Sequence, residues 1–290
     1  MIAIFNGISV GRDVVRAADS SSLLDLYGTN VLMAYSFRKL SSAYAGSAVR
    51  VRRTSDNTEQ DIGFDASGNL DTSTLTTFLG SSDGFITKWY DQSGNSRDGS
   101  QTLASRQIRI ATAGVIVTKN SLPTTQGGAS LHVNISGVPT TSQPVTSFEV
   151  YAHNSATLAG TSGTLTSLVD SNNFIRNDYK RFVRAGVLSK FGTQINAESS
   201  ISQSDTDLHV FTRMLNGSSS VVRTDQVAEA KSGGGDWVVT GAQMGSNTTI
   251  GSNSTSAYRG NLSEVIVYAA DKTSDFTNIE TDIQTYYSIP

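Results

Sequence analysis

Short apolar segments separated by turn residues are the feature that most constrains the fold of this chain. Residues 49–53 alternate valine and arginine, and this period of two predicts a strand with one apolar and one polar face. Similar segments follow at 85–90, 115–118, 131–135 and 147–151. The chain holds 26 glycines and 4 prolines, and only 16% of its residues are charged, a composition typical of many short strands joined by turns. The pattern predicts an all-β sandwich.

The second half of the chain continues this pattern and ends differently. Residues 208–214 and 219–223 flank Asn216-Gly217, a pair that predicts a β-hairpin. The second half of the strand expected at 262–268 is apolar at every position, so we expect it in the centre of a sheet that is covered on both faces. Two helices are expected. One is short, at 71–79, and the other ends the chain with Ser274 as its N-cap and apolar residues at helical spacing, Phe276, Ile279, Ile283 and Tyr286.

The composition excludes several classes of protein. There is no cysteine, which rules out disulfides and thiolate metal sites. The net charge of −3 provides no general attraction for nucleic acid or anionic membrane, so neither is expected as a partner, and no apolar run is long enough for membrane insertion. Residues 1–7 lack the basic region and the long apolar core of a signal peptide, which predicts folding in a cytoplasm.

The first 30 residues differ from the rest of the chain. Apolar residues surround the turn pair Asn6-Gly7, and a polar stretch with a short helical turn at 23–27 follows. We interpret residues 1–30 as an N-terminal attachment arm and residues 31–290 as one sandwich domain. The alternative is an extra strand pair that packs on the same sandwich.

Two motif groups near the start of the sandwich carry a family resemblance. The first comprises residues 34–40, 48–53, 55–57 and 60–64, and the second is Trp89-Tyr90-Asp91-Gln92-Ser93-Gly94-Asn95, closed by Gln101. Together they resemble the catalytic domain of α-L-arabinofuranosidase B enzymes, and more closely the concanavalin A-like (laminin-G-like) modules encoded by tailed bacteriophages. The resemblance implies a concanavalin A-like jelly-roll β-sandwich with a short C-terminal helix.

The resemblance also bears on catalysis. Glycoside hydrolysis needs two placed carboxyl groups, one of which donates a proton. In the arabinofuranosidase family the acid/base aspartate follows an Ile-Gly-Gly stretch, and the similar stretch here, residues 250–253, places Asn253 at that position. An amide does not titrate near neutral pH. The family's adjacent cysteine pair and its Leu-Glu-Asn-Gly nucleophile segment have no counterpart, so the resemblance implies no catalytic residue and no enzyme.

Several side chains are candidates for carbohydrate binding. The turn after the strand at 85–90 combines an aromatic ring with hydrogen-bonding groups. The segment that resembles the family's acid/base region contributes two further candidate residues. The candidates are Tyr90, Asp91, Gln92, Asn95, Asn253 and Tyr258. The alternative for the turn is purely structural, with one of Trp89 and Tyr90 buried and the other exposed, because successive strand residues face opposite ways.

The early arginines and acids allow two interpretations. They are Arg38, Arg50, Arg52, Arg53, Asp56 and Asp61. Arginine suits bidentate pairing, so we expect a structural ion-pair network; a cleft that grips sugar hydroxyls or a carboxylate is the alternative. The three histidines, His132, His153 and His209, stand apart and predict no zinc site. No cofactor is expected. The Gly-Ser-Asn repeats at 245–247 and 251–253 allow three interpretations: a polar hairpin, a rim that binds glycans, or a site that holds calcium through carbonyl oxygens.

The expected function is that of a non-enzymatic structural protein on the surface of a phage virion. It would be a tail-fibre or receptor-binding component or a capsid decoration protein, assembled in the bacterial host cytoplasm. Its expected partners are other virion proteins, copies of itself and a host-surface glycan, bound weakly and strengthened by repetition. Two alternatives stay open: an active glycoside hydrolase of the α-L-arabinofuranosidase type, and an architectural sandwich that binds no sugar.

Overall fold

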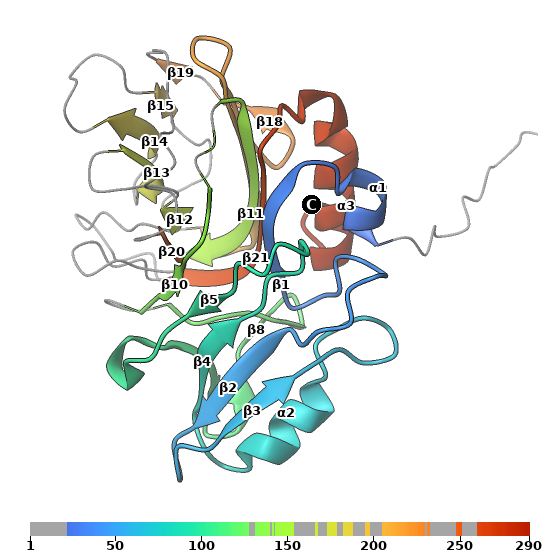
Figure 1. Cartoon of the computed structure of the whole chain (residues 1–290), viewed down its shortest axis with the longest axis vertical. Helices are drawn as coiled ribbons and strands as arrows, with labels where there is room; N and C mark the ends of the chain where they lie inside the picture. Colours follow the sequence, from blue (N-terminus) through green and yellow to red (C-terminus); the bar gives the residue numbers. More distant parts are fainter. Residues whose placement is uncertain are drawn as a thin grey trace, which may run out of the picture.

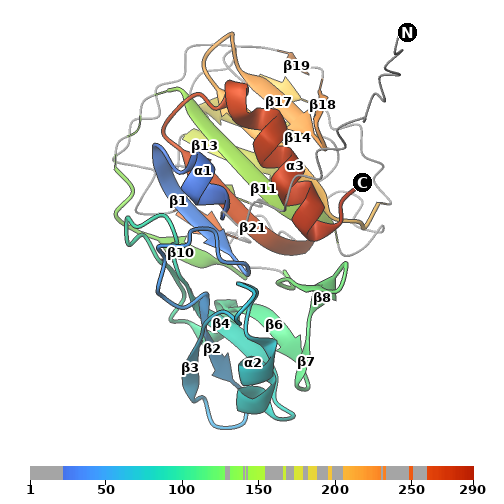
Figure 2. The ribbon, with the colours of Figure 1, turned by 90° about the vertical axis from the view of Figure 1, so that its right-hand side faces the viewer.

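The computed structural model describes residues 22–127, 131–139, 141, 143–153, 205–229 and 260–290, and gives the backbone alone for residue 153 and for strand residues 166–167, 173–178, 182–187, 195–197, 231–232 and 248–250. Figures 1 and 2 show antiparallel sheets stacked on one another, with the C-terminal helix on one outer side. Among the described residues strands dominate, and helices are few. The prediction of an all-β sandwich with a short C-terminal helix is confirmed.

The first sheet is the six-stranded centre of the fold. Its strands run in the order β1 (Val31–Ser36), β21 (Gly260–Tyr268), β11 (Val145–His153), β16 (His209–Leu215), β17 (Val221–Thr224) and β18 (Val227–Ala228). Each neighbouring pair is antiparallel. All nine residues of β21 are buried, which confirms a central strand covered on both faces. The β16–β17 hairpin predicted around Asn216-Gly217 is also present.

The second sheet lies at the lower end of Figure 1 and extends up the side of the molecule. Its strands run in the order β12 (Thr166–Ser167), β20 (Thr248–Ile250), β10 (Val133–Ile135), β5 (Gly99–Ser100), β4 (Gly84–Trp89), β2 (Val49–Arg53) and β3 (Glu59–Ile62), and β6 (Ile108–Thr112) joins β4 to β7 (Val115–Ile116). The alternation in β2 is as predicted, because Val49 and Val51 are buried and the arginines are half-buried. This strand therefore has an apolar inner face and a polar outer face.

Two smaller sheets complete the strands. The third sheet comprises β13 (Asn173–Asp178), β14 (Phe182–Val187), β15 (Ile195–Ala197) and β19 (Lys231–Ser232), and a two-stranded ribbon comprises β8 (Thr118–Lys119) and β9 (Leu122–Pro123). Both views place the third sheet on the opposite side of the first sheet from the C-terminal helix. The first sheet is thus a middle layer.

Two hydrophobic clusters lie on opposite faces of the first sheet. One joins it to the second sheet, for example through Val265 and Val267 beside Val51 and Trp89. The other joins it to helix α3 (Phe276–Tyr287), where Phe148 and Ile266 pack with Ile279, Ile283 and Tyr287. Burying an isoleucine side chain stabilises a fold by about 1.5–3 kcal/mol. The helix is therefore held by its apolar stripe, as its periodicity predicted.

The helix starts follow local capping chemistry. Helix α2 (Thr72–Leu79) begins after Asp71, whose carboxylate accepts a hydrogen bond from the Thr74 amide at 2.9 Å. Helix α3 begins one residue later than expected: a 3₁₀ turn, η2 (Thr273–Asp275), precedes it, so the N-cap is Asp275 and the prediction of Ser274 is wrong. A second 3₁₀ turn, η1, spans Ala104–Arg106.

The N-terminal region is described from residue 22 onward. Helix α1 (Leu23–Tyr27) places Leu23 and Leu24 in the cluster beneath α3, and both helices lie on the same side of the first sheet (Figure 2). The turn pair Asn6-Gly7 and the rest of residues 1–21 lie outside the described residues. The division between an arm and a domain at residue 30 stays a prediction.

Candidate functional site

The turn after β4 carries four of the predicted carbohydrate-binding residues, and the strand period separates its aromatic rings. Trp89 is fully buried and stacks on Phe37 with ring centroids 4.9 Å apart, whereas Tyr90 is half-buried on the other face. The Asp91 carboxylate accepts hydrogen bonds from the amides of Ala34, Ser93 and Arg97 at 2.9–3.0 Å. Asp91 therefore ties the turn to β1.

The next side chains of the turn also bond to the backbone. Gln92 accepts from the Leu40 amide at 2.8 Å and donates to the carbonyls of Ser36 and Arg38 at 3.1 and 3.0 Å. Asn95 donates to the carbonyls of Val31 and Leu32. These amides fasten β1 and the loop after it. Asp91 and Gln92 are buried, whereas Tyr90 is half-buried on the outer face and Asn95 is exposed although it bonds to the backbone. Sugar binding by the predicted residues stays a prediction, and Asn253 and Tyr258 lie outside the described residues.

The predicted ion-pair residues form separate pairs. Arg50 makes a bidentate pair with Asp61 at 2.7 and 2.8 Å, and Arg53 pairs with Asp56 at 2.6 Å. These bonds hold the pKa of both carboxyl groups below the ordinary range. Arg52 instead donates to the amide oxygens of Gln107 and Asn57. The fourth arginine, Arg38, lies elsewhere.

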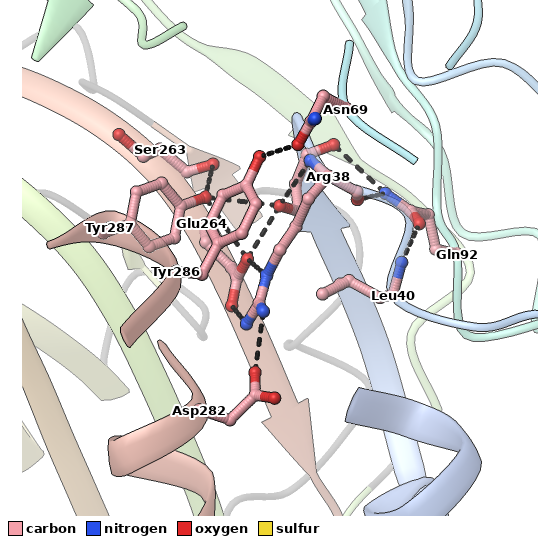
Figure 3. Close-up of polar contacts among 10 residues, drawn as sticks. Arg38, Leu40, Asn69, Gln92, Ser263, Glu264, Asp282, Tyr286 and Tyr287 are labelled. Atoms are coloured by element: carbon pink, nitrogen blue, oxygen red, sulfur yellow. Dashed lines mark hydrogen bonds and ion pairs between the residues drawn. The ribbon is translucent and has the colours of Figure 1, made fainter. Parts of the chain in front are cut away.

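Arg38 occupies the most extensive buried polar centre of the described chain (Figure 3). Its guanidinium donates to both carboxylate oxygens of Glu264, at 2.8 and 3.0 Å, and to Asp282 at 2.7 Å. Glu264 also accepts from the hydroxyls of Ser36 and Tyr287, at 2.7 and 3.2 Å. Burial alone lowers the pKa of Arg38, but the charge of Glu264 outweighs it and raises the pKa.

This centre joins three distant parts of the chain. Arg38 follows β1, Glu264 lies on β21 and Asp282 lies on α3, and the Arg38 guanidinium stacks 4.7 Å from the centre of the Tyr286 ring. Both oxygens of Glu264 are occupied by donors of the chain itself, so the centre holds the helix on the sheet. Sequence reasoning missed it; the only local signal was a glutamate inside an apolar strand.

A second buried carboxylate faces the other way. Glu149 lies on β11 between Phe148 and Val150, which pack toward α3, so its side chain points to the opposite face of the sheet. It forms an ion pair with Arg213 of β16, and both side chains are fully buried. Burial lowers the pKa of Arg213. Nε and Nη1 of this guanidinium have no hydrogen-bond partner in the part of the chain that the structure describes.

The histidines and acids give no metal centre in the described part of the chain. No group of three histidine or acidic side chains there could hold a metal ion. His209 lies between two acids, with Nδ1 2.6 Å from Asp225 and Nε2 3.4 Å from Asp205. The side chain of His153 and the Gly-Ser-Asn repeats proposed for calcium lie outside the described residues. None of the described helices is long and apolar enough to cross a membrane.

Comparison with known protein families identifies the fold to which this chain is related. The model of the α-L-arabinofuranosidase B catalytic family matches residues 24–167, just under half of the chain. The chain shares the frame of the α-L-arabinofuranosidase B catalytic domain. No curated protein sequence matches the chain.

Solved arabinofuranosidases have the same fold over most of this chain. A mutant GH54 α-L-arabinofuranosidase soaked with 4-nitrophenyl α-L-arabinofuranoside superposes with a TM-score of 0.62 at 16% identity. An arabinofuranosidase complexed with arabinofuranosyl-α-1,2-xylobiose gives 0.59 at 14%, and a GH54 enzyme soaked with a cyclic sulfate inhibitor gives 0.58 at 15%. Each match covers 90% of this chain and 64% of the other, so the chain spans less than two thirds of these proteins.

These matches correct the expected function. The prediction of a non-enzymatic phage virion protein, whether tail fibre, receptor-binding or capsid decoration, is wrong, because the matching family is a catalytic one. The non-enzymatic expectation depends on Asn253 at the acid/base position and on the missing cysteine pair and nucleophile segment. Asn253 lies outside the described residues, so no described geometry supports the loss of the proton donor. The alternative, an arabinofuranosidase-type hydrolase, is the better supported interpretation. The predicted partners, self-association and location stay untested.

Proposed function

We propose that the chain is a glycoside hydrolase domain that removes α-L-arabinofuranosyl groups from a carbohydrate. The observation that carries this proposal is the catalytic-family match over residues 24–167. That stretch includes the turn at 89–95 and the arginine strand β2, the same residues on which the sequence resemblance was based. The shared fold with arabinofuranosidases over 90% of the chain supports it.

The substrate class follows from what the relatives bind. One is described with an aryl α-L-arabinofuranoside and another with an arabinofuranose linked α-1,2 to xylobiose. We infer that this chain acts on the same bond, between the anomeric carbon of an arabinofuranosyl group and an oxygen of its carrier. An aryl glycoside with a good leaving group is therefore a suitable first substrate.

The reaction requires two carboxyl groups on opposite sides of the scissile bond. One donates a proton to the leaving oxygen; the other attacks the anomeric carbon directly or activates a water molecule, with separations of about 5–5.5 Å or 6.5–9.5 Å respectively. Glu264 does not suit either role, because both of its oxygens accept bonds from the chain itself. Glu149, on the face of the first sheet away from α3, is the remaining fully buried carboxylate of the central strands.

The other candidates come from the sequence alone. Between residues 154 and 260 the acids whose side chains lie outside the described residues are Asp170, Asp178, Glu198 and Asp236. Replacing each of these and Glu149 by its amide, and measuring 4-nitrophenol release from 4-nitrophenyl α-L-arabinofuranoside, identifies the two that act. Loss of a general acid or base lowers the rate by about 10²–10⁴-fold. The exposed Asp207→Asn is the matched control.

Two outcomes would contradict the proposal. The first is no release of 4-nitrophenol by the purified chain above a heat-denatured sample at millimolar substrate. The second is release that survives every one of the amide substitutions. Asn253→Asp adds a direct check on the acid/base assignment. A faster rate with a new loss of rate at high pH, where a proton donor becomes deprotonated, places residue 253 at the proton-donor position; an unchanged profile assigns the proton to another group.

A further inference from the structure

The outer face of the second sheet carries an ordered row of aromatic and cationic groups, named here the outer strip. It lies on strands β2, β4 and β6 and the turn after β4, and comprises Arg50, Arg52, Phe85, Lys88, Tyr90 and Arg109. All six residues are half-buried, whereas their neighbours Val51, Ile86 and Ile108 are buried on the inner face. Helix α2 packs Leu75 and Leu79 into that inner cluster, so it leaves the outer face open.

Strand register aligns the groups of the outer strip. Arg52 pairs across to Phe85, and Phe85 pairs across to Arg109. Both guanidinium carbons lie over the Phe85 ring, 5.3 and 5.2 Å from its centre. A ring flanked in this way holds two guanidinium planes in fixed positions at little entropic cost when a ligand binds. Phe85 is thus a positioning residue.

Arg50, Lys88 and Tyr90 of the outer strip are also held in place by neighbouring groups. Arg50 holds Asp61 by two hydrogen bonds, and the Tyr90 hydroxyl donates to the same carboxylate at 2.7 Å. The Lys88 ammonium lies 5.2 Å from the centre of the Tyr90 ring. The phenol ring therefore has one orientation, with its apolar surface only partly covered.

Three of the four cations on the outer strip are paired with acids, so most of its charge is neutralised. Arg50 pairs with Asp61, Lys88 with Asp98 at 3.4 Å and Arg109 with Asp83 at 3.5 Å. Among the described residues, the guanidinium of Arg52 hydrogen-bonds only to neutral amide oxygens. Neither nucleic acid nor an acidic polymer gains much from a neutralised surface. A neutral polyhydroxylated ligand suits this surface better, because it binds through an aromatic ring and fixed hydrogen-bond donors. Nη1 of Arg50 and Nη2 of Arg52 are such donors: they make no hydrogen bond among the described residues.

We propose that the outer strip binds a neutral polysaccharide chain, with the Tyr90 ring under a sugar ring and Arg50, Arg52 and Arg109 donating to its hydroxyls. Binding here is separate from hydrolysis, because it needs no bond to break. Its role would be to hold the domain on a polymeric carbohydrate, so it goes beyond the function proposed above and can be tested in the absence of turnover.

Native gel electrophoresis in soluble neutral arabinoxylan tests the proposal. We expect the polysaccharide to retard the wild-type chain. In the Tyr90→Ala/Arg52→Ala double variant the dissociation constant should be about tenfold larger, since the aromatic and guanidinium contacts each change the affinity roughly severalfold. Tyr90→Phe keeps the ring and should retain most of the affinity. Val227→Ala, an exposed apolar residue on β18 of the first sheet, is the control and should bind as the wild type does.

A second measurement keeps the test valid if the double variant fails to fold. Titrating wild-type protein with xylohexaose should shift the amide resonances of β2, β4 and β6 selectively. Shifts confined to other strands, unchanged retardation of a folded double variant, or no retardation of the wild type would each overturn the proposal. Two further results would overturn it. One is stronger retardation by polygalacturonate than by arabinoxylan, which would indicate an acidic ligand; the other is a dimer, detected by sedimentation, that buries the outer strip.

Discussion

Arg38 and Glu264, 226 residues apart in the chain, share two hydrogen bonds through Nε and Nη2 of the arginine and the two carboxylate oxygens. The pair is almost completely buried, with the Arg38 side chain 10% and the Glu264 side chain 1% exposed. Because Arg38 also holds Asp282 of α3, one guanidinium joins the first strand, the central strand and the last helix (Figure 3). A proposed hydrolase of this fold depends on such fixed layers to place its carboxyl groups.

Removing Arg38 should therefore be strongly destabilising. In Arg38→Met the Glu264 carboxylate stays buried without its cation, and breaking a buried pair from one side costs about 3–5 kcal/mol. Urea unfolding should show this loss in the free energy of unfolding. Arg50→Met is the matched control: its pair with Asp61 is exposed, with side chains 41% and 39% accessible, and should cost below about 1 kcal/mol. Equal losses in the two variants would contradict the role assigned to Arg38.

Two glycines should respond in opposite ways to alanine. Gly114 has a φ of +80°, and a β-carbon there would stand 2.0 Å from the Gly80 carbonyl oxygen. Gly114→Ala should cost about 2 kcal/mol or more, because αL strain alone costs about 1–2 kcal/mol. Gly63 has open space around it and no positive φ, so Gly63→Ala should be neutral or stabilising by about 0.4–1 kcal/mol. Thermal unfolding midpoints that fall together in both variants would refute this contrast.

Gln92 should matter for stability more than an exposed amide does. Gln92→Ala removes one acceptor and two donors of backbone hydrogen bonds and leaves the Leu40 amide and the Ser36 and Arg38 carbonyls unpaired in a buried place. Each bond contributes about 0.5–1.5 kcal/mol, so we expect a total loss of about 2–4 kcal/mol by chemical denaturation. Gln92→Glu should recover little of it, since it lacks the two donors. A Gln92→Ala variant as stable as the wild type would show that water replaces all three bonds.

His209 should make stability depend on pH. Burial lowers its pKa, but the hydrogen bond and charge of Asp225, with the charge of Asp205, outweigh burial and raise the pKa above the ordinary value of about 6.5. The protonated pair therefore stabilises the fold fully below about pH 6.5, and this contribution is lost as the pH rises through the raised pKa. The difference in unfolding free energy between wild type and His209→Asn should shrink over that window. A difference that is constant from pH 6 to about pH 9 would contradict the shift.

The strands on which the fold depends could be predicted because they follow local rules. The alternation in β2, the apolar run in β21 and the Asn216-Gly217 hairpin each specify a strand, its faces or its turn from neighbouring residues alone. The start of α3 could not be predicted as reliably, because a 3₁₀ turn at Thr273–Asp275 competes with an α-helical first turn and differs from it by one hydrogen-bond step.

The polar centres show the limit of sequence reasoning. The sequence predicts that Arg38 belongs to a network with the acids near it in the chain. Its partners are instead Glu264 and Asp282, which come close only through the pairing of β1 with β21 and the packing of α3. For Asp91 and Gln92 the sequence allows either ligand binding or a structural turn. A polar turn has the same sequence whether its side chains face a ligand or the backbone of β1.

Local sequence patterns are sufficient to specify the elements of this protein: short strands with distinct faces, a hairpin, an apolar central strand and a closing amphipathic helix. These follow from the periods of two and 3.6 residues, which act between near neighbours. Which charges pair, and which side chains remain accessible on the surface, as in the outer strip, depends on the three-dimensional packing of the sheets and helices. Pairing depends on strand register and layer contacts between residues up to hundreds of positions apart, and no local pattern encodes those distances.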